Sequence, residues 1–198
     1  MTLADLDGVV ALQRDCFPEP FPEELLWQKE HLERHLEIFP EGQFVVREEG
    51  KVVASASNAI LSEEHYQKHL PWEEAVGGFW MSAHDPNGTT LYGLDISVAP
   101  ACRGRGLGAS LYLARFALVR RLKLKRYATS CRMPGFAEWV AHNPGKDRDY
   151  VSEVRNGRIV DRTLTPLLRY GLVPLGIAYD HMDDPESLNC ACLLEWEP

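Results

Sequence analysis

A run of glycines and arginines between residues 102 and 111 has the composition of a phosphate-binding loop. It reads CRGRGLGASL, with glycines at positions 104, 106 and 108 and arginines at positions 103 and 105. Glycines let backbone N–H groups approach a ligand without an intervening Cβ. A helix that begins beside the loop adds its positive N-terminal end, and arginines add direct contacts with phosphate oxygens. The structural alternative is a flexible turn with solvent-exposed arginines.

The spacing of these residues separates three kinds of phosphate-binding motif. A nucleotide-binding P-loop needs a lysine directly after its last glycine, and this loop has none. A dinucleotide-binding loop needs G-x-G-x-x-G, usually in an N-terminal βαβ unit, whereas this loop reads G-x-G-x-G in the middle of the chain. The third pattern, R-x-x-G-x-G, is satisfied by Arg103, Gly106 and Gly108. The spacing therefore favours the third pattern.

The loop needs a strand before it and a helix after it, and the sequence predicts both. Residues 89–98, TTLYGLDISV, form the clearest strand pattern, which Ala99 and Pro100 end. Apolar residues at helical spacing predict a helix at 107–124, and a short strand at 126–131 follows it. The expected buried stripe of that helix is Leu111, Ala114, Leu118 and Leu122.

The remaining segments predict a mixture of helices and strands, with a proline-rich break at 17–22. The expected elements are helices at 2–15 and 22–38, with Leu25, Leu32 and Leu36 buried in the second, a hairpin at 44–47 and 52–60, an irregular segment at 61–88, an excursion with one or two short helices at about 132–160, a short helix within 163–171 that Gly171 ends, and strands at 172–180 and 190–197. This order predicts one α/β (α+β) domain over residues 1–198, built around one sheet.

Composition limits the classes of function. Of the 198 residues, 45% are hydrophobic and 25% are charged, which is typical of a globular protein. The net charge of −8 argues against nucleic acid as a partner. The sequence has no stretch of about 18 apolar residues for a membrane helix. Its N-terminus has no basic region of a signal peptide, so a cytoplasmic location is expected.

Neither the cysteines nor the histidines have the spacing of a metal site. Cys190 and Cys192 form a pair in an expected strand without two further ligands nearby, so we expect the five cysteines to be core or edge thiols. His31 and His35 lie four residues apart, but Glu33 is not where zinc-protease motifs place their glutamate. A solvent-exposed helix face is expected there, and no metal site is predicted.

Residues 91–118, LYGLDISVAPACRGRGLGASLYLARFAL, resemble the acyl-CoA-binding signature of the GNAT superfamily of N-acyltransferases. The resemblance extends to the first expected helix, to the hairpin at 42–60 and to LLRYGLVPLG at 167–176. The runs FPEGQFVV and HDPNGTTLYGLDISV are most similar to GNAT modules found ahead of a nitrilase-like hydrolase in bacterial bifunctional proteins. The resemblance implies a GNAT-like fold, with one mixed, splayed central sheet flanked by helices.

The resemblance also implies acetyl-CoA as the cofactor. Its pantetheine arm would run along the strand at 94–98 and pair with the backbone of Ile96, Ser97 and Val98, where the sheet opens. Its pyrophosphate would rest on backbone N–H groups of the loop and the first helical turn, namely those of Arg103, Gly104, Arg105, Gly106, Leu107, Gly108, Ala109 and Ser110.

Acyl transfer to an amine needs a neutral amine, a donor for the oxyanion and a proton for the leaving thiolate. Asp95 lies in the central strand and His84 in the loop before it, so both are candidate bases. Their structural alternatives are a hydrogen-bonded strand residue and a surface turn. Tyr92 matches a strand position where some family members carry a base, and packing is its alternative role.

Two features depart from the family pattern. Many members have a thiolate-protonating tyrosine four residues before the glycine of the late helix-to-strand turn, and this chain has Leu167 there. Tyr170, directly before Gly171, is the candidate that replaces it. The family also has a strand before its first helix, whereas this sequence opens at the helix. We therefore expect a sheet with an uncovered edge, which favours a homodimer.

Taken together, these features predict an N-acyltransferase that moves an acetyl group from acetyl-CoA to a primary amine of a small molecule or protein. The alternative hypothesis, motivated by Leu167, is a catalytically weak or inactive acyl-CoA-binding regulatory module. The expected partners are acyl-CoA and an amine, without nucleic acid or membrane. The acceptor itself is not specified by the sequence.

Overall fold

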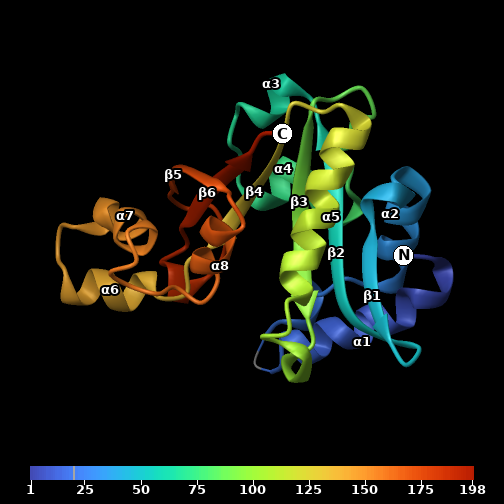
Figure 1. Cartoon of the computed structure of the whole chain (residues 1–198), viewed down its shortest axis with the longest axis horizontal. Coiled ribbons are helices and arrows are strands. Elements are labelled where there is room, and N and C mark those ends of the chain that lie inside the picture. Colours follow the sequence, from blue (N-terminus) through green and yellow to red (C-terminus); the bar gives the residue numbers. More distant parts are fainter. Residues whose placement is uncertain (20) are drawn as a thin grey trace.

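One six-stranded sheet runs through the protein, with strand order β1-β2-β3-β4-β6-β5 (Figure 1). The computed structural model describes residues 1–19 and 21–198; Pro20, in the proline-rich segment, lies outside that description. β3 and β4 are parallel, and the other neighbouring strands are antiparallel. The predicted mixed sheet flanked by helices is confirmed.

Most elements occur where the sequence predicts them. The strands are β1 (Phe44–Glu48), β2 (Lys51–Leu61), β3 (Thr90–Val98), β4 (Arg126–Arg132), β5 (Val173–Ala178) and β6 (Ala191–Trp196). The helices are α1 (Leu6–Cys16), α2 (Lys29–Ile38), α3 (Glu63–Tyr66), α4 (Trp72–Val76), α5 (Leu107–Leu122), α6 (Phe136–His142), α7 (Tyr150–Arg155) and α8 (Leu164–Arg169). The excursion at 132–160 holds α6 and α7, and α3 and α4 lie in the segment expected to be irregular.

The prediction of one helix at 22–38 is wrong. Residues Glu23–Leu25 form a single 3₁₀ turn, and α2 begins only at Lys29. The reason lies at Trp27, whose backbone N–H donates to the buried side chain of Gln13 at 2.9 Å instead of entering a helix. Leu25 is therefore exposed, not buried.

Two further side chains lie in environments that helical spacing did not predict. His35 is fully buried, with Nε2 2.8 Å from the carbonyl oxygen of Phe79, and burial lowers its pKa to about 4. In α5 the buried face contains Arg115, whereas Ala114 is only half-buried.

The five cysteines are free thiols, three of them buried, in line with the expected core positions.

Helices pack on both faces of the sheet. Leu111 of α5 packs against Ala54 and Ala56 of β2 on one face, and α1 contacts β2 and β3 on the other. α6 and α7 lie beside the C-terminal half of the sheet (Figure 1).

β1 and β5 are the edge strands, and the homodimer expected from an uncovered edge stays a prediction. In the residues that the structure describes, no helix is long and apolar enough to cross a membrane.

The sheet opens between β3 and β4. The two strands pair at only three positions, Thr90–Tyr92 with Arg126–Ala128, and then diverge. Gly93 marks the divergence, because a Cβ there would lie 2.1 Å from the Tyr127 hydroxyl oxygen. The Thr129 hydroxyl donates to the Gly93 carbonyl oxygen at 3.2 Å, where the next backbone pair would form. From Gly93 onward, the β4-facing edge of β3 pairs with no strand among the described residues.

Candidate active site

A cleft of about 740 Å³ occupies the gap between the diverging strands. Such a volume is typical of ligand sites. Residues 93–96 of β3 form one wall and residues 129–132 of β4 form the other. Tyr112 and Arg115 of α5 line it on one face of the sheet, and Trp72 and Phe79 line it on the opposite side. The cleft therefore reaches both faces of the sheet.

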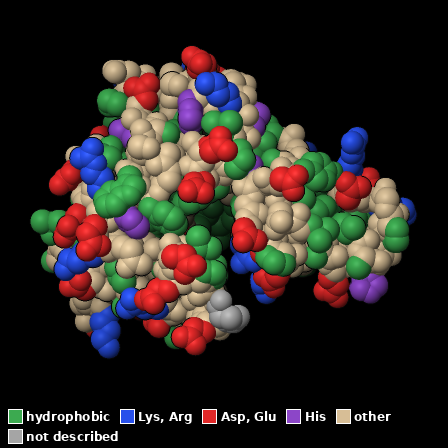
Figure 2. All heavy atoms as spheres, turned by 180° about the vertical axis from the view of Figure 1, so that it is seen from behind, with side chains coloured by type: hydrophobic (Ala, Val, Ile, Leu, Met, Phe, Trp, Pro, Cys, Tyr) green, Lys and Arg blue, Asp and Glu red, His purple; other side chains and the backbone are tan. Residues whose placement is uncertain are grey.

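The two openings of the cleft differ in chemistry. On the side opposite α5, hydrophobic side chains surround a hollow that has acidic side chains around it (Figure 2). The carboxylates that line the cleft are Glu73, Asp95, Asp180 and Asp183. Its two arginines are engaged within the protein: Arg115 by the backbone and Asn58, and Arg132 by Asp184 and Glu186. This opening therefore favours a cationic molecule.

On the α5 side, the glycine loop presents an array of backbone donors. Gly104 and Gly106 have φ values of +75° and +82°, a region that favours glycine. Gly106 is the N-cap of α5, and the first helical hydrogen bond runs from the Ser110 N–H to its carbonyl oxygen at 3.0 Å. Among the described residues, none accepts a hydrogen bond from the six N–H groups of 104–109. We call these six groups the amide array.

The two arginines of the loop have different partners. Arg105 forms two hydrogen bonds with the carboxylate of Glu48, at 2.8 and 2.9 Å. Arg103 donates from Nε to the Val98 carbonyl oxygen at 3.2 Å and so fixes the loop to the end of β3. Glu48 neutralises the charge of Arg105. The amide array is therefore better placed than the Arg105 side chain to bind a phosphate.

Asp95 lines the cleft in the middle of β3. Its Oδ2 accepts hydrogen bonds from Gln13 Nε2 at 3.3 Å and from Ser97 Oγ at 3.4 Å. Burial raises the pKa of this carboxyl to about 6, although the positive charge of Arg115 and the two hydrogen bonds oppose the shift. Asp95 is thus ionised at neutral pH and basic enough to accept a proton.

The other three candidates for proton transfer lie elsewhere. Tyr92 is buried, its hydroxyl donates to Ser130 at 3.3 Å, and burial raises its pKa to about 12. His84 Nδ1 accepts from the Ile60 N–H at 3.1 Å, outside the cleft. Tyr170 packs against Tyr112 with ring centroids 5.3 Å apart, close to the glycine loop. Of the four candidates, Asp95 alone lines the cleft in the described part of the chain.

Arg115 and Gln13 are site residues that the sequence reasoning missed. Arg115 is 1% exposed, and its Nη2 donates to the Asp95 carbonyl oxygen at 2.5 Å while its Nε donates to Asn58 at 2.7 Å. Gln13 accepts from the Trp27 N–H through Oε1 and donates to Asp95 through Nε2. Both occupy positions where helical spacing calls for an apolar residue. A polar residue in an apolar stripe was the available signal.

Comparison with known proteins identifies the family. Residues 6–138 match the Acetyltransferase (GNAT) family. The protein belongs to the GNAT family. This GNAT chain is 35% identical over 196 residues to the Uncharacterized N-acetyltransferase YkwB of Bacillus subtilis (strain 168), covering 99% of this chain and 86% of YkwB. It is 34% identical over 193 residues to the Probable hydrolase YhcX of the same organism, of which it spans only 36%.

Solved structures share the fold. The GphF GNAT-like decarboxylase in complex with isobutyryl-CoA superposes with a TM-score of 0.81 at 23% identity, over 100% of this chain and 96% of that chain. The ribosomal-protein-alanine N-acetyltransferase from Brucella melitensis has a TM-score of 0.60 at 17% identity, over 100% of this chain and 97% of its own. The resemblance predicted from the glycine loop is confirmed, and this GNAT protein is an enzyme of an acyl-CoA-dependent N-acetyltransferase family.

Proposed function

We propose that this GNAT protein transfers an acetyl group from acetyl-CoA to a primary amine of a small molecule or protein. The observation that carries the proposal is the amide array beside the gap between β3 and β4. The array lies at the start of α5, and the open edge of β3 leads from it into the cleft. A long cofactor with phosphates at one end and a thioester at the other matches this arrangement.

The proposed placement of acetyl-CoA follows from the donors available. The pyrophosphate rests on the amide array of 104–109, since the flanking N–H groups of Arg103 and Ser110 donate to the carbonyl oxygens of Pro100 and Gly106. The pantetheine arm lies along the unpaired edge of β3 at 96–98. The thioester then lies deeper in the cleft, near Asp95, where β3 and β4 diverge.

The acceptor amine approaches from the opposite opening. Its alkyl or aromatic part is matched by Trp72 and Phe79, and its ammonium group is matched by the carboxylates of that opening. Asp95 accepts a proton from the ammonium group, so that a neutral nitrogen attacks the thioester carbonyl. A C–N bond forms and the C–S bond breaks, leaving coenzyme A as its thiolate.

A thiol-release assay tests the proposal. The full chain is mixed with acetyl-CoA and a panel of cationic amines and peptides, and free thiol and acetylated product are both quantified. We expect turnover with at least one amine, well above the rate without amine. Tight coenzyme A binding without turnover on any amine would instead support the regulatory acyl-CoA-binding module, which Leu167 favours.

A further inference from the structure

One residue that lines the cleft has a buried nitrogen without a hydrogen-bond partner. In the described part of the chain, buried side-chain atoms of six residues lack a partner, namely those of His35, Gln43, Ser55, Arg126, Tyr127 and His181. Of these residues, His181 alone lines the cleft. Leaving a buried polar group unpaired costs about 1–3 kcal/mol. The unpaired Nε2 of His181 therefore calls for a functional explanation.

The connection between β5 and β6 holds His181 rigidly against the opposite wall of the cleft. Its side chain is 3% exposed. Its backbone N–H donates to the Asn189 carbonyl oxygen at 2.7 Å, and its carbonyl oxygen accepts from the Trp72 N–H at 3.2 Å. Trp72 in turn donates from Nε1 to the Leu94 carbonyl oxygen of β3 at 3.1 Å. These contacts fix His181 relative to the strand that carries Asp95.

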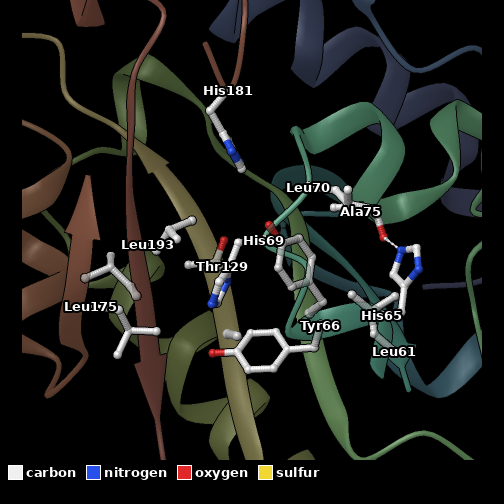
Figure 3. A pocket seen from close by; sticks show the side chains of 13 residues that line it. Leu61, His65, Tyr66, His69, Leu70, Ala75, Thr129, Leu175, His181 and Leu193 are labelled. Carbon is white, nitrogen blue, oxygen red and sulfur yellow. Dashed lines mark hydrogen bonds between the residues drawn. The ribbon is translucent and has the colours of Figure 1, made fainter. Parts of the chain in front are cut away.

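A second, small cavity adjoins the cleft at His181. It has a volume of about 20 Å³, enough for one water molecule. The His181 ring points into this space, which Thr129 and His69 also border (Figure 3). His181 and Thr129 line both the small cavity and the cleft. His181 therefore lies between the cleft and a space large enough for one water molecule.

The surroundings of His181 keep its imidazole neutral before reaction. Burial and the nearby His69 lower its pKa from the ordinary 6.5, so at pH 7 it can accept a proton. Four carboxylates line the same cleft: Glu73 from α4, Asp95 from β3, and Asp180 and Asp183 from the connection that carries His181. The two arginines of the cleft are already hydrogen-bonded within the protein.

The acceptor nitrogen loses more than one proton in the reaction. A primary amine enters as an ammonium ion with three N–H bonds, and the amide product keeps one. Two protons therefore leave the nitrogen in each turnover. A single carboxylate holds one of them at a time, so with Asp95 taking the first proton, the second goes to the departing thiolate or to another base beside the cleft.

Building on the proposed function, we propose that His181 is a catalytic proton acceptor that takes the second proton from the acceptor nitrogen. It does so as the C–N bond forms and the C–S bond breaks. The departing thiolate keeps the electron pair of the C–S bond and takes a proton from solvent. Asp95 and His181 then return their protons to solvent, His181 by way of a water molecule in the small cavity.

The test compares His181→Gln with the wild type and with His142→Gln, which alters an exposed histidine on α6. With acetyl-CoA and the best amine of the panel, kcat is measured from about pH 4.5 to pH 9, so that the range extends well below 6.5, and the Kd of coenzyme A is measured by calorimetry. We expect kcat at pH 7.5 to fall about 100-fold in His181→Gln. The Kd should remain within about twofold, because His181 lies away from the amide array. His142→Gln should match the wild type.

The pH dependence of kcat distinguishes a catalytic role of His181 from a structural one, because a purely structural role would not change with pH. The ratio of wild-type to variant kcat cancels the titration of the amine itself. That ratio should rise with pH through the pKa of His181 and then level off, since the wild type gains its neutral imidazole there. If His181→Gln does not fold, as judged by circular dichroism, His181→Asn replaces it. An active wild type with an equally active variant overturns the inference alone, whereas a wild type inactive on every amine overturns the proposed function as well.

Discussion

Asp95 shows how one carboxylate acquires an acceptor role through its neighbours. It has an ordinary strand position, yet α1 brings Gln13 to its Oδ2 and α5 brings Arg115 to its carbonyl oxygen. Burial raises the pKa of this carboxyl to about 6. When a carboxyl has a higher pKa in the folded protein than in the unfolded chain, its ionisation lowers the free energy of unfolding. Asp95 therefore carries a stability cost at neutral pH, as is typical of residues in functional sites.

Replacing Asp95 by Asn should separate activity from stability. We expect kcat/KM at pH 7.5 to fall by roughly 10²–10⁴-fold, because the amide cannot accept a proton. The melting temperature at pH 7.5 should stay the same or rise, since the stability cost above pH 6 disappears. Asp15→Asn, at an exposed position of α1, is the control and should change neither. A variant that loses stability and keeps its activity would contradict the acceptor role.

At the scale of elements, the loop and α5 form a unit that local sequence signals predict well. Strand alternation, Pro100, the glycine spacing and helical spacing all lie within about 35 consecutive residues, so each constrains the next. His181 could not be predicted in this way. It gains its role only because the β5–β6 connection folds back against α4, and no motif surrounds it. The start of α2 was missed for the same reason, since the side chain that captures Trp27 comes from α1.

The left-handed backbone at Gly106 gives a prediction for this unit. Gly106→Ala places a Cβ on a residue with φ of +82°, which costs about 1–2 kcal/mol of stability. Gly157→Ala, with φ of +72° on the surface after α7, should cost a similar amount and serves as the matched control. We expect only Gly106→Ala to weaken coenzyme A binding, by about tenfold or more, because it distorts the amide array. Calorimetric Kd values and thermal melts of both variants check this, and equal Kd values would contradict the proposed phosphate site.

At the scale of the whole molecule, the sheet consists of two halves joined weakly. Within the sheet, β1–β3 and β4–β6 pair at only three positions, between β3 and β4. The packing of α5 on β2, β3 and β4 and contacts such as that of Trp72 with His181 also connect them. The overall mixed sheet was predictable from the order of elements. The width of the gap was not, because it depends on the Tyr127 hydroxyl lying where Gly93 has no side chain.

A ligand that bridges the two halves should stabilise the whole molecule. Coenzyme A at about 100 times its Kd should add about 2.7 kcal/mol, which for a chain of this size corresponds to a rise of about 5–10 °C in melting temperature. Pantetheine at the same concentration lacks the pyrophosphate and should give a much smaller rise. Differential scanning calorimetry distinguishes the two. Equal shifts would show that the amide array contributes little to binding.

The cleft that reaches both faces of the sheet also bears on the order of events in a catalytic cycle. Under the proposed function, coenzyme A withdraws past α5 while the acylated amine leaves by the acidic opening behind it. Neither product blocks the exit of the other, so release in either order is open to the enzyme. The bulk of the acceptor can remain outside, with only its amine reaching in. The size of the acceptor therefore does not discriminate between a flexible protein terminus and a free diamine. The charge near the acceptor nitrogen becomes the main determinant of specificity.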